Sequence, residues 1–233
     1  MRIAAILLGL GLLTAPALGG SGALCLKSSL GFLGVAPGQC FKHGEAGTLL
    51  AAKIDDGTGR PLSVTMASVS NPARTKEVTT CGDFLNALAD GMTARGDVMR
   101  LFESCDAAML LAAARPARKS FLGAWGADLS NPARVSASIL PGRYAPDVTI
   151  KSLRASGELR VETPVEGDLE LSVGGQRIAY REVARGDFNA DDIEDSLILV
   201  TIQPLGSQPK RYAIVLSRYE AGGMLIRSDQ KGG

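Results

Sequence analysis

Residues 177–203 have the sequence RIAYREVARGDFNADDIEDSLILVTIQ. Two apolar segments, 177–184 and 196–203, flank a short acidic segment, a pattern typical of two strands joined by a loop. The run 197–200 is continuously apolar, which predicts a central strand covered on both faces. We therefore expect an antiparallel sheet to organise the second half of the chain.

Further segments from residue 147 onward resemble strands. Leu169, Leu171 and Val173 alternate with polar residues, as on a strand with one buried face. Glycine, proline and charged residues separate these segments. Residues 141–233 are thus predicted to form a C-terminal β domain, an antiparallel sheet or sandwich, with strands at 147–153, 158–163, 168–173, 177–184, 196–203, 211–218 and 223–227.

The preceding region, residues 24–140, has a mixed pattern and makes the expected fold class α+β. Segments 47–54 and 62–69 flank a turn rich in Asp, Gly and Pro, which predicts two strands. Thr80 and Asp83 form a variant of the capping box ahead of an apolar helical face. A helix is therefore expected to begin at Thr80.

Further helices are expected to start at Asp97 and Asp106, so that this part of the chain forms a short antiparallel helical hairpin. After it, residues 115–146 contain several prolines and glycines, which predicts an irregular linker. A domain boundary is expected near residue 140.

All four cysteines lie in the first half of the chain, at Cys25, Cys40, Cys81 and Cys105. In an exported protein four cysteines indicate two disulfides, with three possible connectivities. We favour Cys25–Cys40 and Cys81–Cys105, because the helical hairpin would bring the second pair together. The alternative is a zinc site that uses Cys40 and His43, although a structural zinc ion needs three or four ligands.

Residues 1–23 have the pattern of a cleavable secretory signal peptide, with Arg2 before an apolar run and small residues up to Ala23, where cleavage is expected. The alternative, a membrane anchor, is disfavoured because Gly and Pro interrupt a run at the short end of the roughly 17–25 residues required. Leu24 argues against lipid attachment at Cys25, since a small residue is expected there. The chain is therefore predicted to be exported, to the periplasm rather than the extracellular medium, without membrane insertion after cleavage.

The charge balance narrows the choice of partners. Without Arg2, 24 basic and 24 acidic side chains remain. A formally neutral chain has no general attraction to phosphate backbones or anionic membranes. We therefore expect no nucleic-acid partner.

The acidic segment of the quoted stretch carries a candidate metal site. Oxygen-bearing side chains stand at its positions 1, 3, 5 and 9, and position 7 can offer a backbone carbonyl. Calcium takes six to eight oxygen ligands, and a tightly coiled loop points its odd-numbered residues inward. The predicted ligands are Asp187, Asn189, Asp191, Ile193 and Asp195.

The segment from Ala184 to Val200 resembles the calcium loops of FG-GAP and VCBS-type repeat proteins, whose Gly-Asp-Phe-Asn-Gly-Asp-Gly-x-x-Asp-Leu consensus leads into an apolar strand. The resemblance implies one bound calcium ion in a loop between two strands. This chain departs from the consensus at Asp192, which replaces a glycine, and contains only one such loop. The alternative interpretation is an acidic hairpin turn without a metal.

Several enzyme classes are excluded by missing residues. His43 is the only histidine, so a zinc hydrolase with two nearby histidines cannot be formed. The mature chain also lacks a nucleophile elbow and a phosphate-binding glycine loop. The expected function is a non-enzymatic binding or structural domain of the cell envelope, whose partner is a protein or an envelope glycan. The alternative is a carboxylate-based, glycosidase-like hydrolase, which would need only two placed acids.

Overall fold

The computed structural model describes residues 23–230, apart from 29, 31–32, 34, 43, 56–59, 95, 100–101, 103–104, 143 and 163–167. The predicted signal peptide, up to residue 22, and His43 lie outside the described residues. Within the described part of the chain, no helix is long and apolar enough to cross a membrane. The fold is α+β, as the sequence predicts.

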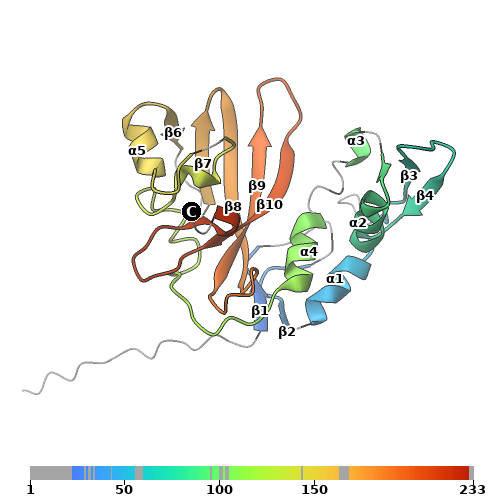
Figure 1. The fold of residues 1–233 in the computed structure, drawn as a ribbon, viewed down its shortest axis with the longest axis horizontal. Helices are drawn as coiled ribbons and strands as arrows, with labels where there is room; N and C mark the ends of the chain where they lie inside the picture. The colour runs from blue at the N-terminus through green and yellow to red at the C-terminus, as the bar shows by residue number, and fades with distance from the viewer. Residues whose placement is uncertain are drawn as a thin grey trace, which may run out of the picture.

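An antiparallel sheet of eight strands dominates the described structure (Figure 1). The strands follow the order β11-β10-β9-β8-β1-β2, and β7 and β6 extend the sheet from β8. Their bounds are β1 Ala23–Leu26, β2 Cys40–Lys42, β6 Leu159–Val161, β7 Asp168–Val173, β8 Gln176–Gly186, β9 Asp195–Gln203, β10 Lys210–Ser217 and β11 Ile226–Arg227.

The long strand β8 connects the two halves of the chain. One edge of β8 pairs with β9 along nearly its whole length. The other edge pairs with β7 up to Arg181 and then with β1 at Ala184 and Arg185. A register shift between Glu182 and Ala184 marks a bulge near this change of partner. Because β1 comes from the first half of the chain, both halves contribute to one sheet.

Side chains of β9 face two separate cores, as the apolar run 197–200 predicts. Leu197 belongs to a first core, built mainly from residues 24–114. Ile198 and Val200 belong to a second core, built from residues 129–225. All three side chains are fully buried. The strand is therefore covered on both faces, because residues next to each other point to opposite sides of a sheet.

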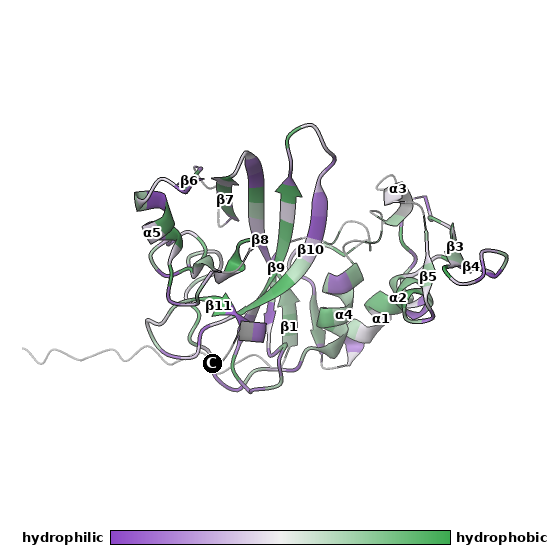
Figure 2. Ribbon diagram, turned by 45° about the horizontal axis from the view of Figure 1, so that its top comes forward, coloured by the Kyte–Doolittle hydropathy of each residue, from purple (hydrophilic) through white to green (hydrophobic). Residues whose placement is uncertain are grey.

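The first half of the chain forms short elements around the first core. A second, three-stranded sheet has the order β4-β3-β5. The helices α1, α2 and α4 show apolar, green stretches beside it and beside the large sheet (Figure 2). The bounds are α1 Thr48–Ala51, β3 Val64–Ser68, β4 Thr75–Val78, α2 Cys81–Ala89, β5 Met92–Thr93, α3 Gly96–Met99 and α4 Cys105–Ala113.

The predicted helix start is confirmed, because the Thr80 hydroxyl accepts a hydrogen bond from the Asp83 amide at 3.0 Å at the start of α2. Two strand predictions are wrong. Residues 47–54 contain α1 instead, since a short apolar run fits a helix as well as a strand and Leu49 is buried against the first core. The predicted strand 147–153 is largely the helix α5, Ile150–Ala155.

The α5 helix has a start signal that the strand prediction overlooked. Thr149 is its N-cap and accepts a hydrogen bond from the amide of Ser152, whose own hydroxyl accepts one from the Thr149 amide. This reciprocal pair is a capping box with Ser in place of the usual Glu or Gln. The β-branched residues around Thr149 favour a strand, and the cap outweighs that preference.

Both favoured disulfides are present. Cys25 and Cys40 lie opposite each other on β1 and β2 and are bonded. Cys81 and Cys105 join the first residues of α2 and α4. The segment between them contains β5 and the single-turn α3. None of the four cysteines keeps a free thiol, so the zinc alternative at Cys40 loses its thiolate ligand.

Candidate functional site: the acidic loop 187–195

The loop that joins β8 to β9 is tightly coiled. Ala190 and Asp192 have φ values of 63° and 65°, in the left-handed region. They are the only described residues other than glycine with a positive φ. Left-handed backbone disfavours residues with a Cβ atom, so the loop holds two strained residues in place.

Side chains of the loop hold its own backbone in this coil. Both carboxylate oxygens of Asp187 accept hydrogen bonds at 3.1 Å, one from the amide of Asp191 and the other from the amide of Asp192. The Asn189 Oδ1 atom accepts from the same Asp191 amide at 3.1 Å. Asp191 in turn accepts from the amide of Ile193 at 2.9 Å. The side chains at positions 1 and 3 therefore converge on the Asp191 amide, and the Asp191 carboxylate accepts a further hydrogen bond from Asn189 Nδ2 at 3.2 Å.

Asp195, the predicted ligand at position 9, is fully buried at the start of β9. Its carboxylate accepts hydrogen bonds from the Phe188 amide at 3.0 Å and from the Ser217 hydroxyl at 2.5 Å. Burial raises the pKa of Asp195 to about 7, although these hydrogen bonds lower it, and the negative charges of Asp191 and Asp187 add to the increase. No sequence pattern pointed to Ser217, which reaches the site because β10 pairs with β9.

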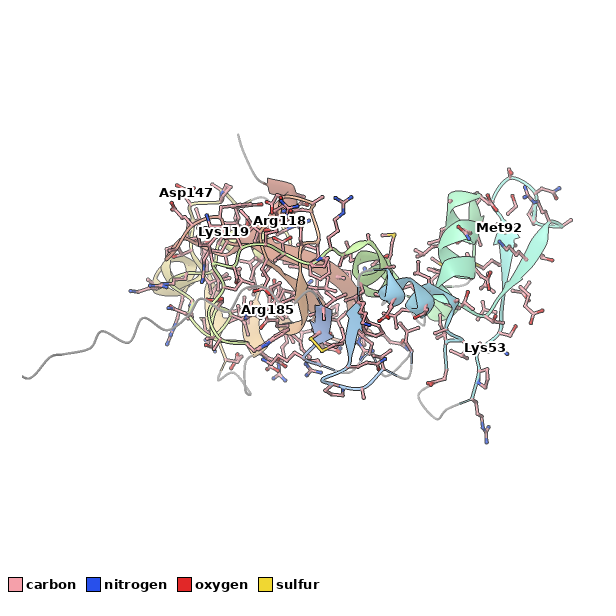
Figure 3. The ribbon with its side chains drawn as sticks, turned by 90° about the horizontal axis from the view of Figure 1, so that it is seen from below. Lys53, Met92, Arg118, Lys119, Asp147 and Arg185 are labelled. Atoms are coloured by element: carbon pink, nitrogen blue, oxygen red, sulfur yellow. A yellow bond between two sulfur atoms is a disulfide. The ribbon has the colours of Figure 1, made fainter. Side chains whose placement is uncertain are left out.

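A segment that the sequence predicts as linker lies along the loop. Arg115 and Asp187 exchange two backbone hydrogen bonds of 2.9 Å, and the amides of Arg118 and Lys119 both donate to the Asp192 carbonyl. The guanidinium of Arg118 is 3.4 Å from the Asp192 carboxylate, and both side chains are mostly exposed. Figure 3 labels Arg118 and Lys119 on this segment. Residues 115–119 thus cover one side of the loop with backbone groups.

The covering segment continues to a buried ion pair in β8. Glu182 accepts hydrogen bonds from Arg185 and Ser196, both at 2.7 Å, and from the amide of Gly126 at 2.6 Å. The Arg185 guanidinium donates to the Gly123 carbonyl at 2.6 Å and lies 4.6 Å from the centre of the Trp125 ring. These contacts fix residues 123–126 to the sheet close to the end of β8 that enters the loop.

The residues present fit calcium in their chemistry. Three carboxylates, one amide oxygen and one carbonyl are hard oxygen donors. An oxygen that accepts one amide hydrogen bond still has a second lone pair for a metal ion. In the part of the chain that the structure describes, however, no three acidic, histidine or cysteine side chains stand close enough together to hold an ion. The loop is therefore tightly coiled and offers suitable oxygen ligands, but among the described residues its carboxylates are not grouped closely enough to surround an ion.

No protein-family model, curated protein or solved structure matches this chain. The case for a metal site therefore depends on the residues of the loop and on their surroundings.

Proposed function

We propose that this chain is an exported, non-enzymatic domain of the cell envelope, and that its loop 187–195 binds one calcium ion that stabilises the junction of β8 and β9. The observation that supports it is a pair of buried carboxylates. Asp187 and Asp195 are 2% and 0% exposed, and among the described residues neither forms an ion pair with Lys or Arg. Buried charge without a partner of opposite sign is costly to a fold.

Calcium would supply two positive charges where the loop has only negative ones. Asp187, Asn189, Asp191 and Asp195 would offer side-chain oxygens, and Ile193 its carbonyl. Asp187 directly follows β8 and Asp195 begins β9, so an ion shared between them would hold these strand ends together. This role is structural, because the ion would stabilise the junction of the two strands.

Export is supported by the two disulfides, which persist in oxidising compartments such as the periplasm. The amino-terminal signal pattern favours the same assignment. Within the envelope, the proposed work of the domain is to bind a protein or a glycan.

Calcium binding is tested by equilibrium dialysis of the metal-free protein at neutral pH, with metal analysis of the protein compartment. We expect one calcium ion per chain in the wild type and none in Asp191→Ala. Asp90→Asn, at the exposed end of α2, is the matched control and should bind like the wild type. Binding by wild type and Asp191→Ala alike would place the ion elsewhere, and no binding at all would refute the proposal.

The alternative, a carboxylate-based hydrolase, needs two acids in a cleft, one of which is kept protonated by burial. Asp147 and Glu220 do line a pocket, but both are exposed residues. An exposed pair of carboxylates is better suited to attract a cation than to donate a proton.

A further inference from the structure

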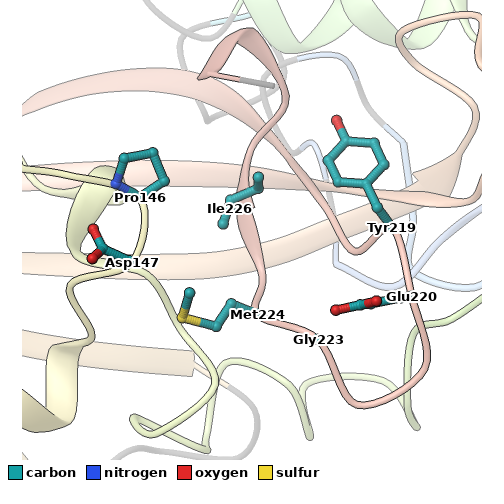
Figure 4. Close-up of a pocket in the computed structure, with 7 residues that line it drawn as sticks. All are labelled: Pro146, Asp147, Tyr219, Glu220, Gly223, Met224 and Ile226. Atoms are coloured by element: carbon teal, nitrogen blue, oxygen red, sulfur yellow. The ribbon is translucent and has the colours of Figure 1, made fainter. Parts of the chain in front are cut away.

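A pocket of about 360 Å³ lies between the turn that follows β10 and the segment that precedes α5 (Figure 4). None of the predicted calcium ligands lines it, although Tyr219 is only two residues from Ser217, which hydrogen-bonds Asp195. Its apolar lining comes from Pro146, Tyr219, Met224 and Ile226. Two carboxylates, those of Asp147 and Glu220, also line it.

The two carboxylates lie on opposite sides of the apolar side chains. In Figure 4, Asp147 is beside Pro146 on one side and Glu220 is on the other, with Met224 and Ile226 between them. In the described part of the chain neither carboxylate forms an ion pair. The pocket therefore presents an apolar middle with a negative charge at each side.

The backbone turn fixes the position of Glu220. The Gly223 amide donates a hydrogen bond of 3.1 Å to the Glu220 carbonyl. A Cβ atom at Gly223 would come within 2.8 Å of Glu220 Cγ and 3.2 Å of its carbonyl oxygen. The stem of Glu220 thus packs on a glycine that leaves no room for a side chain. Its carboxylate lines the pocket, where Figure 4 shows it on the side of Gly223.

We propose that this pocket binds an aliphatic diamine, whose two ammonium groups pair with Asp147 and Glu220 while its alkyl chain covers Met224 and Ile226. Ligand pockets of this size are lined mainly by apolar groups, with a few polar groups that set orientation. The Tyr219 ring adds a surface that favours cations. The shared chemistry, an ammonium group on an alkyl chain, also occurs in a lysine side chain of a protein, and the experiment separates the two sources. The proposal does not depend on calcium in the acidic loop.

The test follows the Met224 methyl resonance in protein with ¹³C-labelled methionine methyl groups, at low ionic strength, because exposed ion pairs are screened by salt. The probes are 1,5-diaminopentane, 1-aminopentane and Nα-acetyl-lysine methylamide. A second exposed ion pair is worth up to a factor of about five in affinity. We expect the diamine to shift the resonance saturably and to bind about fivefold more tightly than the two single amines.

Variants test whether the two carboxylates cause the tighter binding of the diamine. Asp147→Asn and Glu220→Gln should each reduce diamine affinity about fivefold, to the level of the single amines, and Asp90→Asn should leave it unchanged. The variants should fold, because all three positions are exposed. The three probes can also be compared on the wild type alone, so this part of the test does not need the variants. The proposal is overturned if the diamine gives no saturable shift, or if both pocket variants bind like the wild type. If the lysine derivative bound as tightly as the diamine, the proposal would also be overturned, and the pocket would be assigned to a lysine side chain of a protein.

Discussion

The first half of the chain and the second half are stabilised by different interactions. In residues 24–114 the helices and strands are short, and two disulfides connect them. In residues 115–230 the strands β8, β9 and β10 are long and pair in register, and no cysteine is present. There, buried polar contacts hold the irregular segment 115–128 against the sheet. Disulfides thus hold the short elements of the first half together, whereas ion pairs and hydrogen bonds hold the irregular segment of the second half.

This difference determines what each half tolerates. A disulfide stabilises mainly by restricting the unfolded chain, so its loss leaves native packing in place. A buried ion pair acts within the folded state, and removing one partner leaves a buried charge alone. We therefore expect single substitutions to be most damaging in the second half.

The largest effect is predicted for Glu182→Ala. The substitution leaves the buried guanidinium of Arg185 without a carboxylate, and should lower the free energy of unfolding by about 3–5 kcal/mol. Urea denaturation followed by the fluorescence of Trp125, the single tryptophan, measures it directly. Asp168→Ala is the control. It breaks the ion pair Arg181–Asp168 on the same sheet, which is more exposed than the Glu182–Arg185 pair, and should cost at most about 1 kcal/mol. Equal losses in both variants would contradict the comparison.

Next in size is the Cys81→Ser/Cys105→Ser double variant. The disulfide closes a loop with a sequence separation of 24, for which the chain-entropy model gives about 3 kcal/mol. Circular dichroism during urea denaturation should report this loss. Since Trp125 lies in the second half, its native fluorescence should be retained at low urea. A change in the native fluorescence would mean that the disulfide of the first half also maintains the packing of the second half.

The sequence predicted the second half better than the first. Strand periodicity and the apolar run 197–200 are local signals, and the strands β7 to β10 follow them. The segment 47–54 is a short apolar run, whose helical state depends on the burial of Leu49 in the first core. Thr149 carried a cap signal, but its partner Ser152 is not the usual one.

The candidate site was predictable only in part. The loop 187–195 was singled out because its acidic residues recur at alternate positions in the sequence. Their surroundings were not, because Ser217 and residues 115–119 reach the loop through strand pairing and through backbone hydrogen bonds, which carry no residue pattern. The pocket between Asp147 and Glu220 was missed for the same reason, since its walls are distant in the sequence.

The stability of the metal-free protein should depend on pH through the buried carboxyl of Asp195. Its pKa is raised to about 7 in the folded protein, against an ordinary value of 3.8. The folded state therefore binds more protons than the unfolded state between these values, so its extra stability is full below about pH 4 and is lost as the pH rises through 7. For the metal-free protein we expect a loss of roughly 2–4 kcal/mol over this range in urea denaturation. Asp195→Asn should remove the dependence, and an equal slope in that variant would assign it to other groups.

The smallest effect is predicted for Ala190→Gly. Glycine relieves the left-handed strain at φ 63°, so the free energy of unfolding should rise by about 0.5–1 kcal/mol. The control is Ala73→Gly, at an exposed position with ordinary φ, where the added freedom of the unfolded chain should lower stability by a few tenths of a kcal/mol. The two substitutions should change the free energy of unfolding in opposite directions. If both variants were less stable than the wild type, the backbone would not be strained at Ala190.

Calcium-dependent thermal unfolding tests whether the loop 187–195 binds a stabilising calcium ion. Free calcium at about 100 times its dissociation constant should stabilise the wild type by roughly 2.7 kcal/mol, or about 5–10 °C in melting temperature, relative to protein in chelator. Asp191→Ala should melt at one temperature in both conditions, and magnesium should replace calcium poorly because it requires a smaller, near-octahedral shell. If the wild type also melts at the same temperature with calcium and with chelator, the loop is an acidic turn and holds no metal.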